Sequence, residues 1–217
     1  MASDSLQGRH FDAVIFDVDQ TLVDSARALG EVWGRWMAEY DVEPDTSRSW
    51  HGWTSEAIIR LCLPEERVAE GLRRIEELET TLTEDITALP GAAESLAALP
   101  PERVAVGTSG TAAVARARLA AAGLDCPPVL VSADDVEHGK PAPDVFLAAA
   151  HGLGADPTRC LVVEDAAAGL AAARAAGMDT LAVMTSTPPD QLDADARVRD
   201  LSEVAWRVDE AGIAVEL

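Results

Sequence analysis

The chain has 217 residues, of which 48% are hydrophobic, and a formal net charge of -21 at pH 7. Length and composition predict one sizeable domain, or a core domain with a smaller insert, and argue against wholesale disorder. The charge opposes nucleic acid and anionic membranes as partners, so an anionic substrate would need a local positive site, such as a metal or one well-placed cation.

Signals for export and for disulfide bonds are missing from the sequence. No apolar stretch approaches the ~20 residues that a membrane span requires. The opening MASDSLQGRH lacks the pattern of a signal peptide and is expected to be a frayed tail. Cys62, Cys126 and Cys160 are odd in number and outside any CxxC spacing, which favours reduced thiols. We therefore expect a soluble cytoplasmic protein, as a monomer or weak homodimer.

The first predicted element is a strand over residues 12–17, which carry Val and Ile on both faces, as in a parallel sheet. It runs directly into Asp17 and Asp19. Gln20 then stands at the bend, where a tight turn would more naturally take glycine.

Residues 26–87 show helical patterns without a good strand, at 26–40, 55–63 and 65–82. We predict a helical insert, with residues 1–24 and 88–217 forming the core domain and 25–87 the inserted one. The charged residues of the insert, spaced at i, i+3 and i+4, predict a solvated helix face. Its tryptophans are predicted to anchor its own small core: Trp33, Trp36 and Trp50.

After the insert, strands and alanine-rich helices alternate. Strands are predicted at 104–107, 129–132, 160–164 and 180–183, with helices at 111–122, 143–151 and 166–176. Glycines lie where C-terminal helix caps are expected, at Gly123, Gly152 and Gly177. The alternation predicts an α/β fold with an open parallel sheet and right-handed crossovers.

Polar residues gather at the carboxyl ends of the predicted strands, where ligands bind in open parallel sheets. One of them is Lys140, the sole lysine among 17 basic residues, which suggests a position that needs a compact ammonium group. In chain order the set is Asp17, Asp19, Thr108, Ser109, Lys140, Glu164 and Asp165.

These side chains together suit phosphoryl transfer. A carboxylate can accept the phosphoryl group as an aspartyl phosphate, and a second carboxylate two residues on could protonate the leaving oxygen and then activate water. Oxygen ligands without His or Cys favour Mg²⁺. Thr108, with the backbone N–H groups of Ser109 and Gly110 opening a helix, would form an anion-binding cradle, and Lys140 would add positive charge.

Four segments resemble, in order, the motifs of the haloacid dehalogenase superfamily of phosphatases. DVDQT is similar to its first motif, DxDxT; GTSG to the second; HGKPAPD to the third; and VVEDAAAGLAAARAAGM to the fourth. The helical insert resembles the first type of cap domain in that family. The resemblance spans nearly the whole chain and implies a Rossmann-like parallel sheet with helices on both faces and an inserted all-helical cap.

The resemblance also implies roles for the acidic residues. Asp17 would be the nucleophile and Asp19 the general acid/base. Mg²⁺ would be held by Asp17, the main-chain carbonyl of Asp19, and Asp165, with Glu164 assisting. The alternative for Asp17 and Asp165 is that they cap helices or pair with arginine; for Glu164 it is loop hydrogen bonding.

The phosphoryl group would be bound by Thr108, Ser109 and Lys140, although Ser109 could also serve only in loop hydrogen bonding. The Lys140–Pro141 bond is expected to be cis, as a tight loop can require. The family most often has glycine where this chain has Gln20. We expect Gln20 to sit at an ordinary φ with its side chain away from the phosphate.

Other branches of the family fit less well. Dehalogenases need no acid for a phosphate leaving group, so Asp19 argues against that branch. Phosphonate-cleaving relatives need a lysine in the cap, and the insert has none. Sugar-phosphate mutases use a histidine and an arginine at positions that align here with Leu29 and Ser55, so water is favoured as the acceptor.

The segment HGWTSEAI in the insert is predicted to select the leaving group through His51, Gly52, Trp53 and Thr54. The alternative is cap packing for Trp53 and a helix N-cap for Thr54. This loop resembles phosphatases of small sugar and polyol phosphates, such as glycerol phosphate or 2-deoxyglucose 6-phosphate. We therefore predict a Mg²⁺-dependent phosphatase of a small phosphorylated metabolite. A phosphoglycolate phosphatase, a mutase and a non-catalytic phosphate-binding module remain as alternatives.

Overall fold

A six-stranded parallel sheet forms the centre of the molecule in the computed structural model, which describes residues 5–43 and 53–217. The strand order is β5-β4-β1-β6-β7-β8, and every neighbouring pair is parallel. The predicted α/β fold is confirmed, and one sheet strand, β8, was not predicted. The strands are β1 (Ala13–Phe16), β4 (Val104–Gly107), β5 (Val129–Val131), β6 (Cys160–Glu164), β7 (Asp179–Val183) and β8 (Ala196–Val198).

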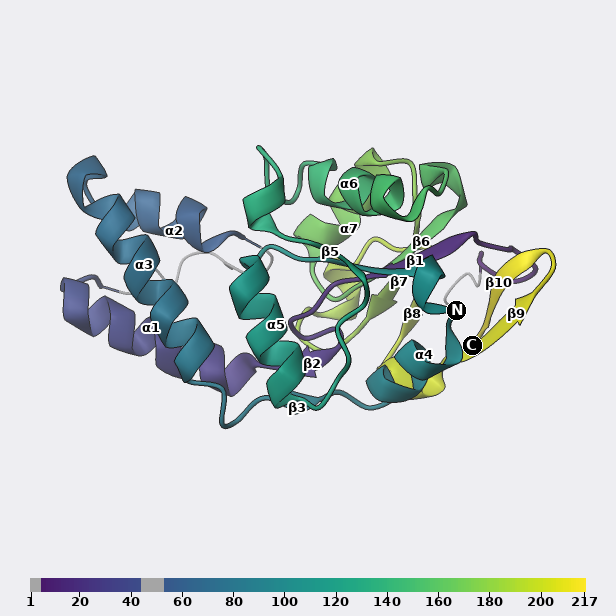
Figure 1. Cartoon of the computed structure of the whole chain (residues 1–217), viewed down its shortest axis with the longest axis horizontal. Coiled ribbons are helices and arrows are strands. Elements are labelled where there is room, and N and C mark those ends of the chain that lie inside the picture. The colour runs from purple at the N-terminus through teal and green to yellow at the C-terminus, as the bar shows by residue number, and fades with distance from the viewer. Residues whose placement is uncertain (1–4, 44–52) are drawn as a thin grey trace.

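Helices cover both faces of the sheet (Figure 1). Ala13 and Ile15 of β1 pack in the cluster beneath α6 (Asp144–Leu153) and α7 (Ala167–Ala175). Val14 and Phe16 pack in a second apolar cluster, on the opposite face of the sheet. All four β1 side chains are buried, as expected for a central parallel strand. The elements on the second face are α4 (Ala92–Ala98), α5 (Ala112–Ala121) and the hairpin of β9 (Ala205–Asp209) and β10 (Gly212–Glu216).

Two of the three predicted glycine caps are confirmed. Gly123 and Gly177 follow α5 and α7 with φ of 70° and 77°. The prediction for Gly152 is wrong, because this residue lies inside α6 and Gly154, at φ 64°, ends that helix. Gly152 is needed for packing instead, since a Cβ there would lie 2.9 Å from a methyl group of Val129.

The helices α1 (Ala26–Tyr40), α2 (Ser55–Cys62) and α3 (Glu65–Thr81), called the helical segment below, pack around an apolar cluster of their own to one side of the sheet (Figure 1). Trp36 is fully buried, stacks on Tyr40 at 4.6 Å and donates its indole N–H to the Gly71 carbonyl at 2.9 Å. Trp36 is thus an anchor as predicted, and the half-buried Trp33 packs edge-on against it at 5.6 Å. Trp50 lies outside the described residues.

A short antiparallel ribbon joins the helical segment to the sheet. In it, β2 (Val23–Asp24) pairs with β3 (Thr87–Ala88), so the chain leaves and re-enters the core side by side.

Among the described residues, none of the helices combines the length and the apolar composition that a membrane span requires. All three cysteines are free thiols, as predicted.

The expectation of a frayed N-terminal tail is wrong from Ser5 onward. Leu6 is fully buried in the core, Ser5 donates its hydroxyl to the Asp195 carbonyl at 2.9 Å, and Arg9 pairs with Asp179 at 2.7 Å. Burial of the Leu6 side chain in the core is enough to hold this stretch in place. The polar and charged residues around Leu6 give no indication of this burial in the sequence.

Candidate active site

The strand order brings the predicted site residues to one edge of the sheet. Since β1 lies between β4 and β6, the side chains that end or follow these strands meet there: Asp17, Thr108, Glu164 and Asp165. All four are buried, and all four line a cavity of about 610 Å³. At the carboxyl edge of such a sheet, the connections from neighbouring strands run to opposite faces. A crevice that can bind a ligand lies between them.

Lys140 reaches this group from the loop after β5. Its ammonium donates to Asp17 Oδ1 at 2.6 Å and to Glu164 Oε1 at 2.8 Å, and its side chain is 1% exposed. Burial opposes the charged form, but the two carboxylates outweigh burial and raise the pKa of Lys140. The Lys140–Pro141 peptide is cis, as expected. The sole lysine therefore neutralises part of the carboxylate cluster.

Three buried carboxylates, of Asp17, Glu164 and Asp165, offer oxygen atoms that all lie within 4.8 Å of one another. One ammonium group leaves this cluster with an excess of negative charge. Burial raises the pKa of Asp17 to about 7, and the carboxylates of Glu164 and Asp19 act in the same direction against the opposing effect of Lys140. Burial also raises the pKa of Asp165. Uncompensated charge and an oxygen-only set fit a hard divalent cation such as Mg²⁺.

The metal-free protein is expected to lose stability as the pH rises toward 7. The folded state raises the pKa of Asp17 from 3.8 to about 7, so the stability linked to that proton is complete below 3.8 and is lost as the pH passes through about 7. A divalent cation held by these oxygens would bind the deprotonated form, so added Mg²⁺ should raise the melting temperature more at about pH 8 than at about pH 5. Thermal melts in Mg²⁺ and in EDTA at both pH values test this, and equal shifts would contradict it.

Glu164 uses both of its oxygens inside the protein. Oε1 accepts from Lys140 and Oε2 accepts from the Ala166 N–H at 2.6 Å. Gly169 in α7 makes room for it, because a Cβ at Gly169 would lie 1.7 Å from Glu164 Oε1. Glycine is therefore required at position 169 of the fourth motif, because the Glu164 carboxylate occupies the space that a Cβ would need.

Gly169→Ala is expected to displace Glu164 from Lys140, to lower the free energy of unfolding by about 1–3 kcal/mol and to reduce turnover. Urea denaturation and phosphate release measure the two effects. Gly34→Ala is the matched control, since a Cβ at that helical glycine meets nothing within 4 Å and should be neutral or stabilise by up to about 1 kcal/mol. Equal behaviour of the two variants would show that the space at Gly169 is not needed.

The structure differs in one detail from the phosphate cradle predicted at Thr108, Ser109 and Gly110. Thr108, Ser109 and Gly110 all line the cavity, but α5 begins only at Ala112, with Thr111 as its N-cap. The Gly110 N–H donates to Thr108 Oγ1 at 3.2 Å. The prediction that Ser109 and Gly110 open the helix is therefore wrong, because the capping hydroxyl is that of the next threonine along the chain.

Gln20 adopts a left-handed backbone, with φ 59°, so the expectation of an ordinary φ is wrong. The chain reverses tightly here: the Gln20 N–H donates to the Val23 carbonyl at 2.7 Å. Its side-chain amide donates to Asp24 Oδ1 at 3.1 Å, and Thr185 Oγ1 donates to its carbonyl. Hydrogen bonds thus hold a conformation that glycine would adopt without strain.

Gln20→Gly is expected to leave hydrolysis within roughly tenfold, or about 1.4 kcal/mol of barrier. The free energy of unfolding should change by less than about 1 kcal/mol, because relief of left-handed strain offsets a lost hydrogen bond and a more flexible unfolded chain. Steady-state kinetics and urea denaturation measure both. A larger loss of turnover would mean that the Gln20 side chain takes part in the site directly.

Two hydroxyl residues at this edge were missed in the sequence. Thr185 and Ser186 follow β7 and line the cavity, and Ser186 Oγ donates to Asp165 Oδ2. The rule that located the other residues, to read the carboxyl ends of the strands, would have found them had it been applied to this strand.

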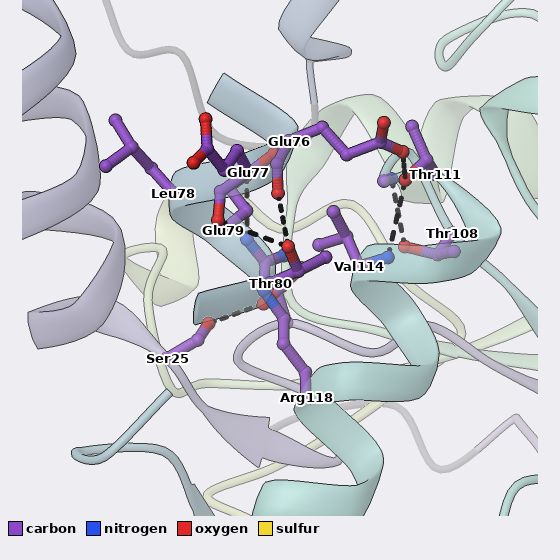
Figure 2. A network of polar contacts seen from close by, with 12 residues as sticks. Ser25, Glu76, Glu77, Leu78, Glu79, Thr80, Thr108, Thr111, Val114 and Arg118 are labelled. Carbon is purple, nitrogen blue, oxygen red and sulfur yellow. Dashed lines mark hydrogen bonds and ion pairs between the residues drawn. The ribbon is translucent and has the colours of Figure 1, made fainter. Parts of the chain in front are cut away.

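A buried ion-pair network beside Asp19 was also missed. Arg118 on α5 contacts Asp19 Oδ2 and donates to Glu79 Oε1 on α3 at 2.8 Å, while Ser25 Oγ donates to Asp19 Oδ1 at 2.5 Å (Figure 2). Glu79 was expected on a solvated helix face, and this is wrong, because its side chain is only 7% exposed against α5. Nothing in the sequence distinguishes Arg118 from the exposed arginines.

The helical segment supplies the other wall of the cavity. Leu29 and Ser55 of this segment line the cavity, and so does Trp53, which lies just before α2 and is 41% exposed. Thr54 is the N-cap of α2 and accepts from the Ala57 N–H at 3.2 Å, which agrees with the alternative considered for it. The predicted loop residues His51 and Gly52 lie outside the described residues.

A family model described as haloacid dehalogenase-like hydrolase matches residues 14–183, well over half of the chain. The chain belongs to this family. The resemblance seen in the four motifs is therefore confirmed.

Relatives within the hydrolase family point to phosphate esters. Hexitol phosphatase A of Escherichia coli (strain K12) is 41% identical over 175 residues, which cover 78% of this chain and 81% of that protein. Fructose-1-phosphate phosphatase YqaB of the same organism is 36% identical over 185 residues, covering 80% and 96%. A solved structure of a hydrolase from Pseudomonas syringae superposes with a TM-score of 0.79 at 29% identity, covering 88% and 94%. The chain is an enzyme of the phosphoric monoester hydrolase class.

Proposed function

We propose that this enzyme is a Mg²⁺-dependent phosphatase of sugar or polyol monophosphates that works through an aspartyl phosphate on Asp17. The observation that carries the proposal is the convergence of the sole lysine and three buried carboxylates on one side of a cavity at the sheet edge. Residues 1–24 and 88–217 would form the catalytic core, and residues 25–87 a cap over it.

In the first step, a carboxylate oxygen of Asp17 attacks phosphorus and forms the acyl phosphate bond. The bond from phosphorus to the ester oxygen breaks, and the proton of the Asp19 carboxyl group passes to that oxygen, so a neutral alcohol leaves. The pleated strand β1 holds Asp17 rigidly, and the side chain has only 9% of its surface exposed. Rigid placement of the nucleophile lowers the entropy cost of reaching the transition state.

In the second step, Asp19, now a carboxylate, takes a proton from water as the water oxygen attacks phosphorus. The acyl phosphate bond breaks, inorganic phosphate forms and Asp17 returns to its starting form. The same carboxylate thus acts first as acid and then as base, and the number of protons balances over the cycle.

The positive charge for both steps would come from two sources. Asp17, the main-chain carbonyl of Asp19, and Asp165 would hold Mg²⁺, which when bound would neutralise charge on the phosphoryl oxygens. Lys140 contacts Asp17 directly and keeps Glu164 in place. Thr108 and Ser109 would donate to the phosphoryl oxygens from the end of β4.

The lining of the cavity suggests an uncharged leaving group. Its apolar wall includes Leu29, Trp33, Met37 and Ile58 of the helical segment, and Trp53 just before α2. Among the described residues the only cationic side chain that lines it is that of Arg118, whose guanidinium already contacts two carboxylates. Aromatic faces with a few hydroxyl groups suit a carbon chain that carries hydroxyls, as in the substrates that name the two Escherichia coli relatives.

A sugar-phosphate mutase would have to bind a second phosphate at the same wall. The positions where mutases of this family carry histidine and arginine are Leu29 and Ser55, and both line the cavity. Neither side chain brings a positive charge, so water is favoured over a second sugar phosphate as the acceptor.

Phosphate release from a panel of phosphorylated metabolites, with Mg²⁺ or with EDTA, tests the proposal. We expect Mg²⁺-dependent hydrolysis of hexitol, ketohexose and glycerol monophosphates, with weaker turnover of phosphoglycolate and of bisphosphates. Interconversion of a sugar 1-phosphate and its 6-phosphate, stimulated by the bisphosphate, would replace the proposal by the mutase. Hydrolysis of none of these esters would overturn the substrate class.

A further inference from the structure

Arg118 forms a buried bridge between the core and the helical segment. Its side chain is 5% exposed and contacts Asp19, which is 99 residues away in the chain, and Glu79, which is 39 residues away. Figure 2 shows the side chain extending from α5 toward α3, with Glu79 at its far end. All three residues line the cavity in which the ester would bind.

Both oxygens of Asp19 are held by hydrogen-bond donors. Oδ2 is bonded to the guanidinium of Arg118 and Oδ1 to the hydroxyl of Ser25. Arg118 lies on α5 and Ser25 directly before α1, so the side chain of Asp19 is fixed from both sides.

The orientation of Arg118 depends on where α3 lies. Glu79 accepts from its second guanidinium nitrogen, and a separate contact fixes the same helix pair, in which Thr111 Oγ1 donates to Glu76 Oε1 at 2.7 Å (Figure 2). Glu76 and Glu79 are one helical turn apart on α3, so they face α5 together. A shift of α3 away from α5 would remove the carboxylate that orients the arginine.

Stability alone does not account for this bridge. Apolar side chains of similar volume usually stabilise a buried position as well as an ion pair does. Burial raises the pKa of Glu79, and the nearby Asp19 adds to that effect, while Arg118 opposes it. Burial of the charged Glu79 carboxylate is therefore costly, and yet this group is retained near Asp19, the residue assigned to proton transfer.

We propose that Arg118 is a positioning residue for the acid/base Asp19, and that Glu79 makes this positioning depend on contact between α3 and α5. The inference rests on the proposed phosphatase function. Its consequence is specific to one event, the transfer of the proton from Asp19 to the ester oxygen while the phosphorus–oxygen bond breaks. Attack by Asp17 itself does not need the bridge.

Two substrates separate these events. A sugar or polyol oxygen is a poor leaving group and needs the proton, whereas 4-nitrophenolate leaves without one. The value of kcat/KM covers the steps up to departure of the alcohol, so it reports proton donation without the later hydrolysis of the acyl phosphate. Loss of positioning should therefore lower kcat/KM for sorbitol 6-phosphate much more than for 4-nitrophenyl phosphate.

The main variant is the double substitution Arg118→Met with Glu79→Gln, which removes both charges while nearly preserving volume. A second variant, Arg118→Lys, keeps a charge between the carboxylates if the double variant does not fold, but a compact ammonium lacks the two-pronged geometry. Arg116→Met is the matched control, because Arg116 lies on the exposed side of the same helix. Thermal melts of all variants confirm that each is folded.

For the double variant we expect kcat/KM to fall roughly 100-fold with sorbitol 6-phosphate and by less than about threefold with 4-nitrophenyl phosphate. Arg118→Lys should lose less on the first substrate and as little on the second. Arg116→Met should match the unsubstituted enzyme on both.

Equal losses on the two substrates would overturn the inference and leave Arg118 with a structural role. Unchanged turnover of sorbitol 6-phosphate would overturn it as well. Failure of the unsubstituted enzyme on both substrates is a different result, because it would overturn the proposed phosphatase function and this inference with it.

Discussion

Asp17→Asn is expected to abolish turnover, by at least about 10⁴-fold, while the protein stays folded. An amide oxygen is a poor nucleophile, so the acyl phosphate cannot form. The fold should tolerate the change because Asn has the shape of Asp, and its carbonyl can still accept from Lys140. Removing one of several buried carboxylates that repel one another should keep or raise the free energy of unfolding in EDTA at about pH 8.

Phosphate release and urea denaturation measure these two outcomes. The matched control is Asp12→Asn, at the opposite end of β1, where a half-exposed aspartate pairs with Arg159 at 2.8 Å. That variant should keep its activity. Turnover that persists in Asp17→Asn would exclude the aspartyl phosphate, and loss of folding would mean that the carboxylate is needed structurally.

Lys140→Met is expected to lower the free energy of unfolding by about 3–5 kcal/mol in EDTA at about pH 8 and to abolish turnover. Its ammonium group contacts both Asp17 and Glu164, and its side chain is only 1% exposed. Methionine fills a similar space but leaves two buried carboxylates without a cation. Burial already raises the pKa of Asp17 to about 7, so at about pH 5 the Asp17 carboxylate would take up a proton and the loss of stability should be smaller.

Urea denaturation at the two pH values measures the effect on stability. A second change, Glu164→Gln, in the Lys140→Met background should restore part of the stability, because it removes one unpaired buried charge. It should not restore turnover, because the ammonium group of Lys140 is still missing. Mg²⁺ should restore part of it as well. If Lys140→Met were as stable as the unsubstituted enzyme in EDTA, the ammonium would not be neutralising the cluster.

The sheet and the identity of its edge residues could be predicted because both depend on local pattern. Strand β1 is apolar on both faces, and a parallel sheet collects the carboxyl ends of its strands at one edge whatever their exact order. The four motifs are also local. Asp17, Thr108, Lys140 and Asp165 were therefore assigned to one site although they are spread over most of the chain, and the structure brings them together.

Other features depended on neighbours that are far apart in the sequence. The left-handed backbone of Gln20 is held in part by Thr185, whose hydroxyl donates to the Gln20 carbonyl, and the role of Gly152 follows from the approach of Val129. Propensity alone does not include these contacts, so the corresponding predictions were wrong.

Local pattern in the sequence was enough to assign the family of the protein, its parallel sheet and the polar residues that meet at the edge of that sheet. The burial of Glu79 and the contact of Arg118 with Asp19 depend instead on how the helices pack. The physical reason is that helical periodicity tells which side chains share a face, but not which other helix covers that face. Whether a charged residue on it meets water or a partner is settled when α3 and α5 pack.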